Sequence, residues 1–293
     1  MYGTGSRVRN WLLIEQNGAW GHDAVSESDL DPGVAAELKR KAARHRIRLL
    51  LIRRPGRPEG SGHECYAAHS GVEDQWVQRC RVDDLAELLD IDLACVRGGT
   101  RPEMGRPWDK PLYLVCTNGS HDPCCERYGG PVARALALDR ADETWECSHV
   151  GGDRFAANLV CLPHGLYFGR VQPEDAAEVA SLYENGLVHL DHYRGRSCFE
   201  PIVQAADIFI RVATGMAGID DLIPESRRDQ GAGRSTLGFR DHLGARHEIS
   251  VAAHRGDLRP ITCNAAHPGA PREYELVSLS SDETAGIRPI GDG

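Results

Sequence analysis

Short apolar runs alternate with an amphipathic stretch near the start of the chain, which predicts a strand, a helix and a second strand. The apolar runs lie at 10–16 and 46–53, and the amphipathic stretch at 34–45 has its apolar positions on one face. Asp31 and Pro32 precede that stretch, where a helix cap and a first-turn proline are expected. This pattern is typical of an α/β unit.

The same pattern restarts after residues 96–110, a segment rich in glycine, proline and charge that we expect to mark a boundary. A predicted strand at 111–115, a polar loop at 116–123 and a predicted helix at 124–138 follow it. The other predicted elements are a helix at 82–89, a strand from Trp145, a hairpin of strands at 155–163 and 165–171, helices at 173–183 and 200–213, and a strand–turn–strand unit at 238–252.

We therefore expect three parts. They are an N-terminal α/β half at residues 8–100, a second unit at 108–215, and a small C-terminal β extension with a tail at 216–293. The two halves open alike, with WLLIEQNGAWGHDA in the first and LYLVCTNGSHDPCC in the second. One interpretation is that the halves are related, and the other is that α/β units simply recur.

The net charge and the lengths of the apolar runs limit which partners and which location we expect. The 293 residues contain 34 Lys and Arg against 43 Asp and Glu, a net charge of −9. This acidity argues against general nucleic-acid binding or an anionic membrane surface as partner. No apolar run approaches the ~20 residues that span a bilayer, and the first residues lack a signal-peptide core. We therefore expect a cytoplasmic protein with reduced thiols.

The ten cysteines divide into two sets. Five are dispersed, and we interpret them as small core or incidental residues: Cys65, Cys80, Cys95, Cys198 and Cys263. Five others fall within 46 residues, the region where chemistry could lie: Cys116, Cys124, Cys125, Cys147 and Cys161. Of these, Cys161 lies in an apolar run and is interpreted as a core residue. No Cys-x-x-Cys occurs in the chain, so an ordinary thioredoxin-type dithiol is not supported.

Within the second set, position indicates metal or redox chemistry. Cys116 ends a predicted strand, while Cys124 and Cys125 begin a predicted helix, whose partial positive charge favours thiolates. Cys147 and His149 are two residues apart, so in an extended chain their side chains would share a face. The Gly-Gly pair at 151–152 would allow a tight turn beside a bulky ligand.

The segments VCTNGSHDPCC (115–125) and WECSHVGGDRFAANLVCLPHGLYFGR (145–170) resemble the sucrase/ferredoxin-like family. The resemblance extends, more thinly, from residue 12 to about residue 215. It implies a thioredoxin-like [2Fe–2S] ferredoxin domain at 108–215, an electron-transfer or redox role, and redox partner proteins. No pair of carboxylates supports a sucrase activity.

The resemblance also implies cluster ligands. The family's Cys-x8-Cys spacing selects Cys116 and Cys125, and His149 falls on the first histidine of a His-x-Gly-Gly-His pattern. The second histidine of that pattern is replaced by Asp153. Carboxylates are hard ligands and uncommon in a site of soft sulfur, so the fourth ligand is open.

Three residues are candidates for the fourth position: Cys147, which we favour, Asp153 and Cys124. Two other functions remain open. One is a structural zinc site made by Cys116, Cys125, Cys147 and His149. The other is a thiol-dependent redox enzyme using Cys124 and Cys125. The sequence does not decide the oligomeric state, the redox partner or whether the protein turns over a substrate.

Overall fold

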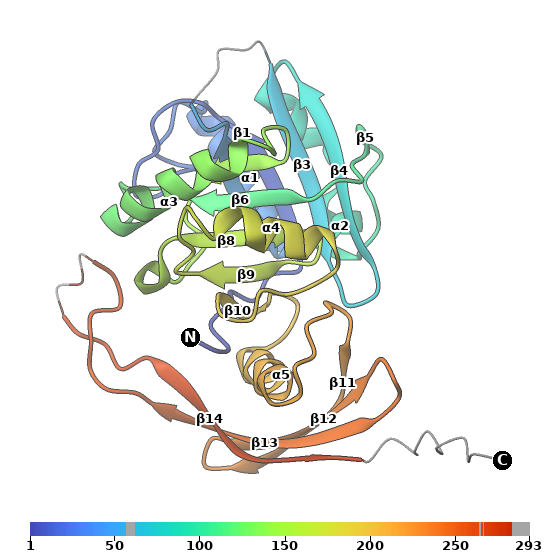
Figure 1. Ribbon diagram of the computed structural model, residues 1–293. Helices are drawn as coiled ribbons and strands as arrows, with labels where there is room; N and C mark the ends of the chain where they lie inside the picture. Colours follow the sequence, from blue (N-terminus) through green and yellow to red (C-terminus); the bar gives the residue numbers. More distant parts are fainter. Residues whose placement is uncertain (57–61, 264, 266, 283–293) are drawn as a thin grey trace.

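The computed structural model describes residues 1–56, 62–263, 265 and 267–282 (Figure 1). Within these residues the protein is mixed α/β, as predicted, with one large curled sheet and one smaller sheet. The last part of the predicted C-terminal tail, from residue 283 on, lies outside the described residues. No helix in the described part of the chain is both long and apolar enough to cross a membrane.

The first half begins with the predicted strand, helix and strand. Its elements are β1 (Asn10–Glu15), α1 (Pro32–His45), β2 (Ile47–Arg53), β3 (His63–Ser70), β4 (Gln75–Val82), the 3-10 helix η1 (Leu85–Asp90), α2 (Leu93–Arg97) and β5 (Arg106–Pro107). Asp31 caps α1 by accepting hydrogen bonds from the N–H groups of Gly33 and Val34, as the sequence predicts.

The predicted helix at 82–89 is wrong in type and start. Val82 still belongs to β4, and a tighter 3-10 turn follows it. A reciprocal capping box fixes that turn, because Asp84 accepts a hydrogen bond from the N–H of Ala86, while Glu87 accepts one from the N–H of Asp84. The α-helix of this region, α2, begins only at Leu93, after the predicted range, and is about one turn long.

The second half follows the prediction closely. Its elements are β6 (Leu112–Cys116), α3 (Pro123–Ala137), β7 (Thr144–Cys147), the 3-10 helix η2 (Asp153–Phe155), β8 (Asn158–Leu162), β9 (Leu166–Gly169), α4 (Ala176–Glu184) and β10 (Tyr193–Arg196). Strands β8 and β9 form the predicted hairpin.

All ten strands of the two halves join one sheet, in the order β10-β9-β8-β6-β7-β2-β1-β3-β4-β5. Each half repeats one arrangement, a parallel β-α-β unit followed by two antiparallel strands: β2-β1-β3-β4 in the first half and β7-β6-β8-β9 in the second. The halves meet where β2 pairs with β7 in antiparallel orientation, at Ile52↔Cys147 and Arg53↔Glu146. The sheet thus continues across residues 96–110, and the proposed domain limits stay a prediction.

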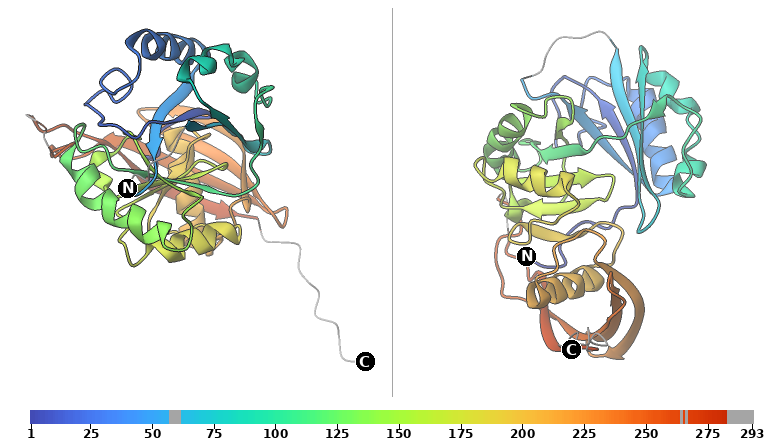
Figure 2. Two further views of the ribbon diagram at one scale, coloured as in Figure 1. Left: turned by 90° about the horizontal axis from the view of Figure 1, so that it is seen from above. Right: turned by 45° about the vertical axis from the view of Figure 1, so that its right-hand side comes forward.

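The sheet encloses a central core between its two halves. Apolar side chains of β1, β2 and β3 form one buried cluster with those of β6, β7 and β8. Aromatic rings join across it, with Tyr66 against Trp145 at 5.7 Å and Trp11 against Tyr167 at 6.4 Å between centroids. The helices cover the outer faces, α1 on one side and α3 with α4 on the other (Figure 2).

The C-terminal part is a separate four-stranded antiparallel sheet that wraps around α5 (Pro201–Thr214) (Figure 1). Its strands are β11 (Leu222–Gly231), β12 (Arg234–Asp241), β13 (Arg246–Arg255) and β14 (Arg272–Ser281). The predicted strand–turn–strand unit at 238–252 corresponds to β12 and β13. The outer strands β11 and β14 were not predicted.

One glycine sets how closely α3 approaches β6. A Cβ atom on Gly129 would lie 2.1 Å from the carbonyl oxygen of Cys116, which is closer than any real side chain allows. At the next residue, Gly130, the nearest atom to such a Cβ is Arg134 Nη1 at 3.4 Å, which is an ordinary contact. The pair therefore offers a matched test of this packing.

We expect Gly129→Ala to lower the free energy of unfolding by about 1–3 kcal/mol, because the helix must move away from the strand. Gly130→Ala should leave it unchanged or raise it by up to about 1 kcal/mol, because alanine favours helix. Urea denaturation measures both. Equal effects of the two substitutions would contradict the close contact between α3 and β6.

Candidate metal centre

The structure brings three of the four residues of the predicted ligand set together. Cys116 ends β6, Cys125 lies in the first turn of α3, and His149 lies in the turn after β7. The two Sγ atoms and a ring nitrogen of His149 all lie within 4.8 Å of one another. Both thiols are fully buried, so the group is a compact donor set shielded from water.

The start of α3 fixes Cys125. Asp122 caps the helix, accepting a hydrogen bond from the N–H of Cys124 at 2.9 Å, and Pro123 occupies the first helical position. The N–H of Cys125 donates to the carbonyl oxygen of Asp122 at 2.9 Å. This N-terminus points its partial positive charge toward the donor set, as the sequence predicts.

Asp153 lies at the edge of the donor set. Its Oδ1 atom lies 3.0 Å from His149 Nδ1 and accepts a hydrogen bond from the Cys125 thiol at 3.6 Å. Asp153 is 5% exposed, so water competes little for these contacts. Together with His121 and His149 it forms a second group of ligand atoms within 4.8 Å.

Cys147 is placed differently. It is fully buried at the end of β7, in register with Cys116, yet no group of potential ligand atoms found among the described residues includes its sulfur. The shared face of Cys147 and His149 was expected only if the chain stayed extended, and β7 ends at Cys147, so His149 lies outside the strand. The argument that put Cys147 and His149 on one face therefore fails, and the ligand role of Cys147 stays a prediction.

The structure pairs Cys124 with Cys263 in a disulfide. This differs from the expectation that the thiols are reduced and that Cys263 is incidental. The N–H of Cys263 also donates to Asp122 Oδ2 at 2.7 Å, so the C-terminal loop is fastened at the cap of α3. With its sulfur engaged in this bond, Cys124 is not free to act as a ligand.

Two further imidazoles form a stack with His149 of the donor set. The sequence offered His121 only as a loop residue, more often solvated than near a ligand, and it did not single out His22. His121 lies on His149 with 3.8 Å between ring centroids, and His22 lies on His121 at 4.3 Å. A hydrogen bond from Asn118 Nδ2 to the carbonyl oxygen of Gly21 joins the same two loops. The similar openings of the two halves, NGAWGHDA and NGSHDPCC, were the available signal, since these loops meet in the fold.

The histidines line an open pocket of about 350 Å³ that reaches the centre from the surface. Its lining includes His22, Asn118, His121, Arg48 and His149. The His149 side chain is 19% exposed, in contrast to the buried thiols. The imidazole edge is therefore the part of the centre that a partner molecule can approach.

The ionisable groups of the centre shift one another's pKa. Burial lowers the pKa of His149, but Asp153 and the Cys116 sulfur outweigh it and raise the pKa to about 9. A hydrogen bond from Cys125, aided by His149, holds the pKa of Cys116 well below its usual value despite burial. The same contact raises the pKa of Cys125. The direction of this shift favours the thiolate form of Cys116, the form in which cysteine binds metals.

The glycine pair forms the predicted tight turn. Gly151 and Gly152 adopt φ angles of +96° and +86°, which other residues rarely adopt. A Cβ at Gly152 would lie 2.2 Å from Arg194 Nη2. Buried Arg194 also donates to Asn158 Oδ1 at 2.6 Å and to the carbonyl oxygen of Gly151 at 3.3 Å, so it holds the turn in place.

Comparison with known proteins agrees with the resemblance found in the sequence. The model of the sucrase/ferredoxin-like family matches residues 1–195. This chain belongs to the sucrase/ferredoxin-like family. The match spans both halves of the large sheet and ends within β10.

One similar protein is the altered inheritance of mitochondria protein 32 of the yeast Meyerozyma guilliermondii. It is 32% identical over 95 residues, covering 29% of this chain and 34% of the relative. The chain thus spans about a third of the length of that curated relative. No solved structure matches this family member.

The disulfide gives a direct test of the C-terminal loop. Without reductant, mass spectrometry of a digest should find Cys124 and Cys263 in one cross-linked peptide. Cys263→Ser should lower the free energy of unfolding by about 3–5 kcal/mol, because the cross-link spans 139 residues. The free thiol of Cys95 provides a control, and Cys95→Ser should change little. Complete alkylation of Cys124 and Cys263 in the non-reduced protein would rule the cross-link out.

Proposed function

We propose that this family member is a [2Fe–2S] electron-transfer or redox protein. Cys116, Cys125 and His149 would hold the cluster. The observation that carries the proposal is the buried group of two thiols and one imidazole within 4.8 Å, at a helix N-terminus. Residues 108–215 would form its thioredoxin-like ferredoxin domain, a proposal supported by the β-α-β unit and antiparallel hairpin of the second half.

The donor chemistry fits such a cluster. Thiolates are the usual ligands of iron–sulfur clusters, and imidazole nitrogen replaces two of them at one iron in some [2Fe–2S] centres. When bound, the cluster supplies a site that accepts and returns one electron. The lowered pKa of Cys116 favours the ionised ligand, and the N-terminus of α3 stabilises negative charge there.

The protein's own residues orient and shield the site. The carboxylate of Asp153 lies 3.0 Å from His149 Nδ1 and places a negative charge beside the imidazole. Full burial of Cys116 and Cys125 excludes water from the sulfur side, while the stacked rings of His121 and His22 border the exposed side. A redox partner protein would approach over this pocket.

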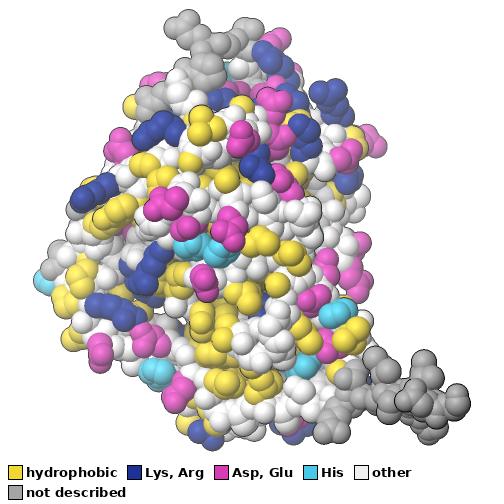
Figure 3. Space-filling view, in the orientation of Figure 1, with side chains coloured by type: hydrophobic (Ala, Val, Ile, Leu, Met, Phe, Trp, Pro, Cys, Tyr) yellow, Lys and Arg dark blue, Asp and Glu magenta, His cyan; other side chains and the backbone are white. Residues whose placement is uncertain are grey.

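Charge agrees with a protein partner. With a net charge of −9, the chain would attract basic partner surfaces. Acidic and basic side chains are interspersed over the face drawn in Figure 3, without one broad basic surface for a nucleic acid. We therefore keep redox partner proteins as the proposed partners. The cytoplasm stays the compartment that the sequence predicts, while the disulfide of Cys124 with Cys263 argues for a less reducing one.

Geometry favours Asp153 as the fourth ligand. Its Oδ1 atom lies 3.6 Å from Cys125 Sγ and 3.0 Å from His149 Nδ1, and it shares a ligand group with His149 and His121 rather than with the thiols. By comparison, the sulfur of Cys147 belongs to no ligand group in the described chain, and that of Cys124 is bonded to Cys263. Asp153 also stands where the family pattern has its second histidine. We infer that Asp153 completes the set, in place of Cys147, which the sequence favoured.

The same donors also suit zinc, which accepts thiolate, imidazole and carboxylate ligands. A zinc site would be structural and would carry no electron. The proposed thiol enzyme has less support, because Cys124 is in a disulfide with Cys263. The metal content of the purified protein therefore distinguishes the cluster from zinc.

Protein purified without oxygen should be red-brown, bleach on reduction and contain two irons per chain. Cys116→Ser and Cys125→Ser should each abolish the visible absorption, because each removes a ligand. Cys95→Ser, at a free cysteine remote in sequence from the centre, should retain it. A colourless protein with one zinc per chain would exclude the cluster. Equal loss in all three variants would mean that folding, not ligation, had been measured.

The fourth ligand is tested by a second pair of variants. Asp153→Ala should lose most of the iron, whereas Cys147→Ser should keep it, provided circular dichroism shows both to be folded. The opposite pattern would make Cys147 the ligand and leave Asp153 to orient His149. His149→Cys should retain iron but lower the reduction potential, because a thiolate adds negative charge. An unchanged potential would remove His149 from the ligand set.

A further inference from the structure

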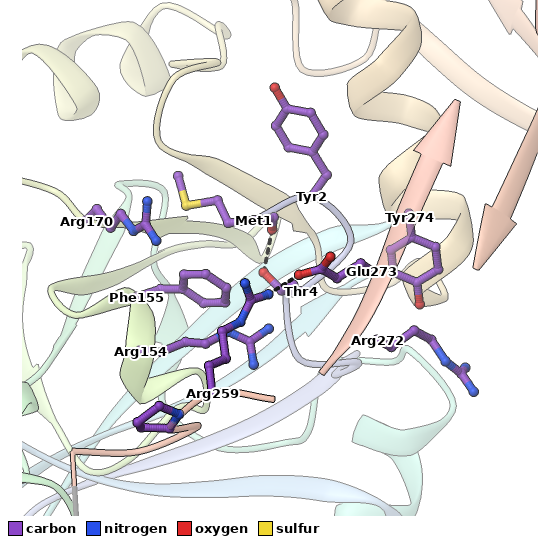
Figure 4. A pocket seen from close by; sticks show the side chains of 11 residues that line it. Met1, Tyr2, Thr4, Arg154, Phe155, Arg170, Arg259, Arg272, Glu273 and Tyr274 are labelled. Atoms are coloured by element: carbon purple, nitrogen blue, oxygen red, sulfur yellow. Dashed lines mark hydrogen bonds and ion pairs between the residues drawn. The ribbon is translucent and has the colours of Figure 1, made fainter. Parts of the chain in front are cut away.

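A basic cavity lies away from the thiols, where the second half of the large sheet meets the C-terminal sheet. It has a volume of about 430 Å³ (Figure 4). Its lining residues come from the N-terminal segment, the end of η2, the residue after β9, the loop before β14 and the start of β14: Met1, Tyr2, Thr4, Arg154, Phe155, Arg170, Arg259, Pro260, Arg272, Glu273 and Tyr274. Four arginines and one glutamate line it. This excess of three positive charges stands out in a chain whose net charge is −9.

Most of this charge is uncompensated. Among the described residues, Arg154, Arg170 and Arg272 form no ion pair, and only Arg259 has a carboxylate partner, Glu273. The Nε atom of Arg154 is buried without a hydrogen-bond partner. Burial together with the nearby charges of Arg259 and Arg170 lowers the pKa of Arg154. Guanidinium groups held together in this way favour an anion between them.

The ring of Phe155 organises these cations. The guanidinium carbons of Arg154, Arg194 and Arg170 lie 4.5, 4.8 and 5.7 Å from its centroid. The negative face of the ring offsets part of their mutual repulsion. In Figure 4, Phe155 separates Arg170 from Arg154, and Arg259 lies beside Arg154, while Arg272 points away beside Tyr274.

Arg170 occupies a backbone position that arginine disfavours. Its φ angle is +57°, in the left-handed region that glycine and asparagine adopt with less steric strain than arginine. Its N–H donates to the carbonyl oxygen of Phe155 at 2.7 Å, which ties it to the η2 turn. A cationic side chain thus lies at the rim of the cavity on a strained backbone position.

We propose that this cavity binds the phosphate group of a small phosphorylated molecule. Arg154, Arg170 and Arg259 would contact the phosphate oxygens, because planar guanidinium groups match them with paired hydrogen bonds. The volume lies within the range of small-molecule sites and admits a group of nucleotide size or less. Glu273, which pairs with Arg259, opposes the bound charge.

The test is calorimetric titration of the intact chain at low ionic strength with pyrophosphate. Arg170→Gln and Arg259→Gln should each weaken binding about tenfold, because each removes a charged donor. Glu273→Gln should strengthen it severalfold, since it removes a repelling carboxylate and frees Arg259. Arg228→Gln provides the matched control, because Arg228 is an exposed arginine on β11 outside the cavity.

Parallel titrations distinguish the ligand's source. Tighter binding of ADP than of pyrophosphate would assign an organic phosphate, and the reverse order would assign the free inorganic ion. Tighter binding of citrate than of either would overturn the phosphate assignment. No heat from millimolar pyrophosphate, equal weakening by Arg228→Gln, or weaker binding by folded Glu273→Gln would overturn the site itself.

Discussion

The short antiparallel contact between β2 and β7 is the constraint on which the rest of the molecule depends. In the described part of the chain, two register pairs join the half-sheets. The ion pair of Arg53 with Glu146 spans the same point at 2.8 Å. Because the strands overlap only at their carboxyl ends, the loops that follow β1 and β6 converge. His22 from one half thereby reaches His121 and His149 of the other. The surroundings of the candidate metal centre therefore depend on the β2–β7 contact as well as on the Cys116–Cys125 motif.

Local sequence patterns were enough to predict the elements that carry the two thiols. The strand end at Cys116 and the capped helix start before Cys125 are fixed by apolar pattern, Asp122 and Pro123, so these residues could be placed in advance. The same signals failed one turn further on. β7 ends at Cys147, and the residue that follows it, Ser148, donates its N–H to Leu51 of β2, a contact with the other half that no local pattern encodes.

The missed elements have a related cause. Strands β11 and β14 are exposed along most of their length, so they lack the apolar alternation that marks a half-buried strand. The pairing of Cys263 also left no signal in the sequence. Its partner Cys124 lies 139 residues away, and the loop between β13 and β14 shows no periodic pattern. By contrast, β12 and β13 pack apolar faces on α5 and were predictable.

The η2 turn links the two proposed sites. Asp153 faces the thiols and His149, while its neighbour Arg154 faces the basic cavity, and the disulfide at Cys263 anchors the loop that carries Arg259. If both proposals hold, a phosphate bound beside Arg154 would add negative charge near a cluster that would itself gain negative charge on reduction. Each event would then oppose the other, and linkage requires the effect to be reciprocal. The two proposed sites would therefore be coupled through the η2 turn, because its neighbouring residues Asp153 and Arg154 face one site each.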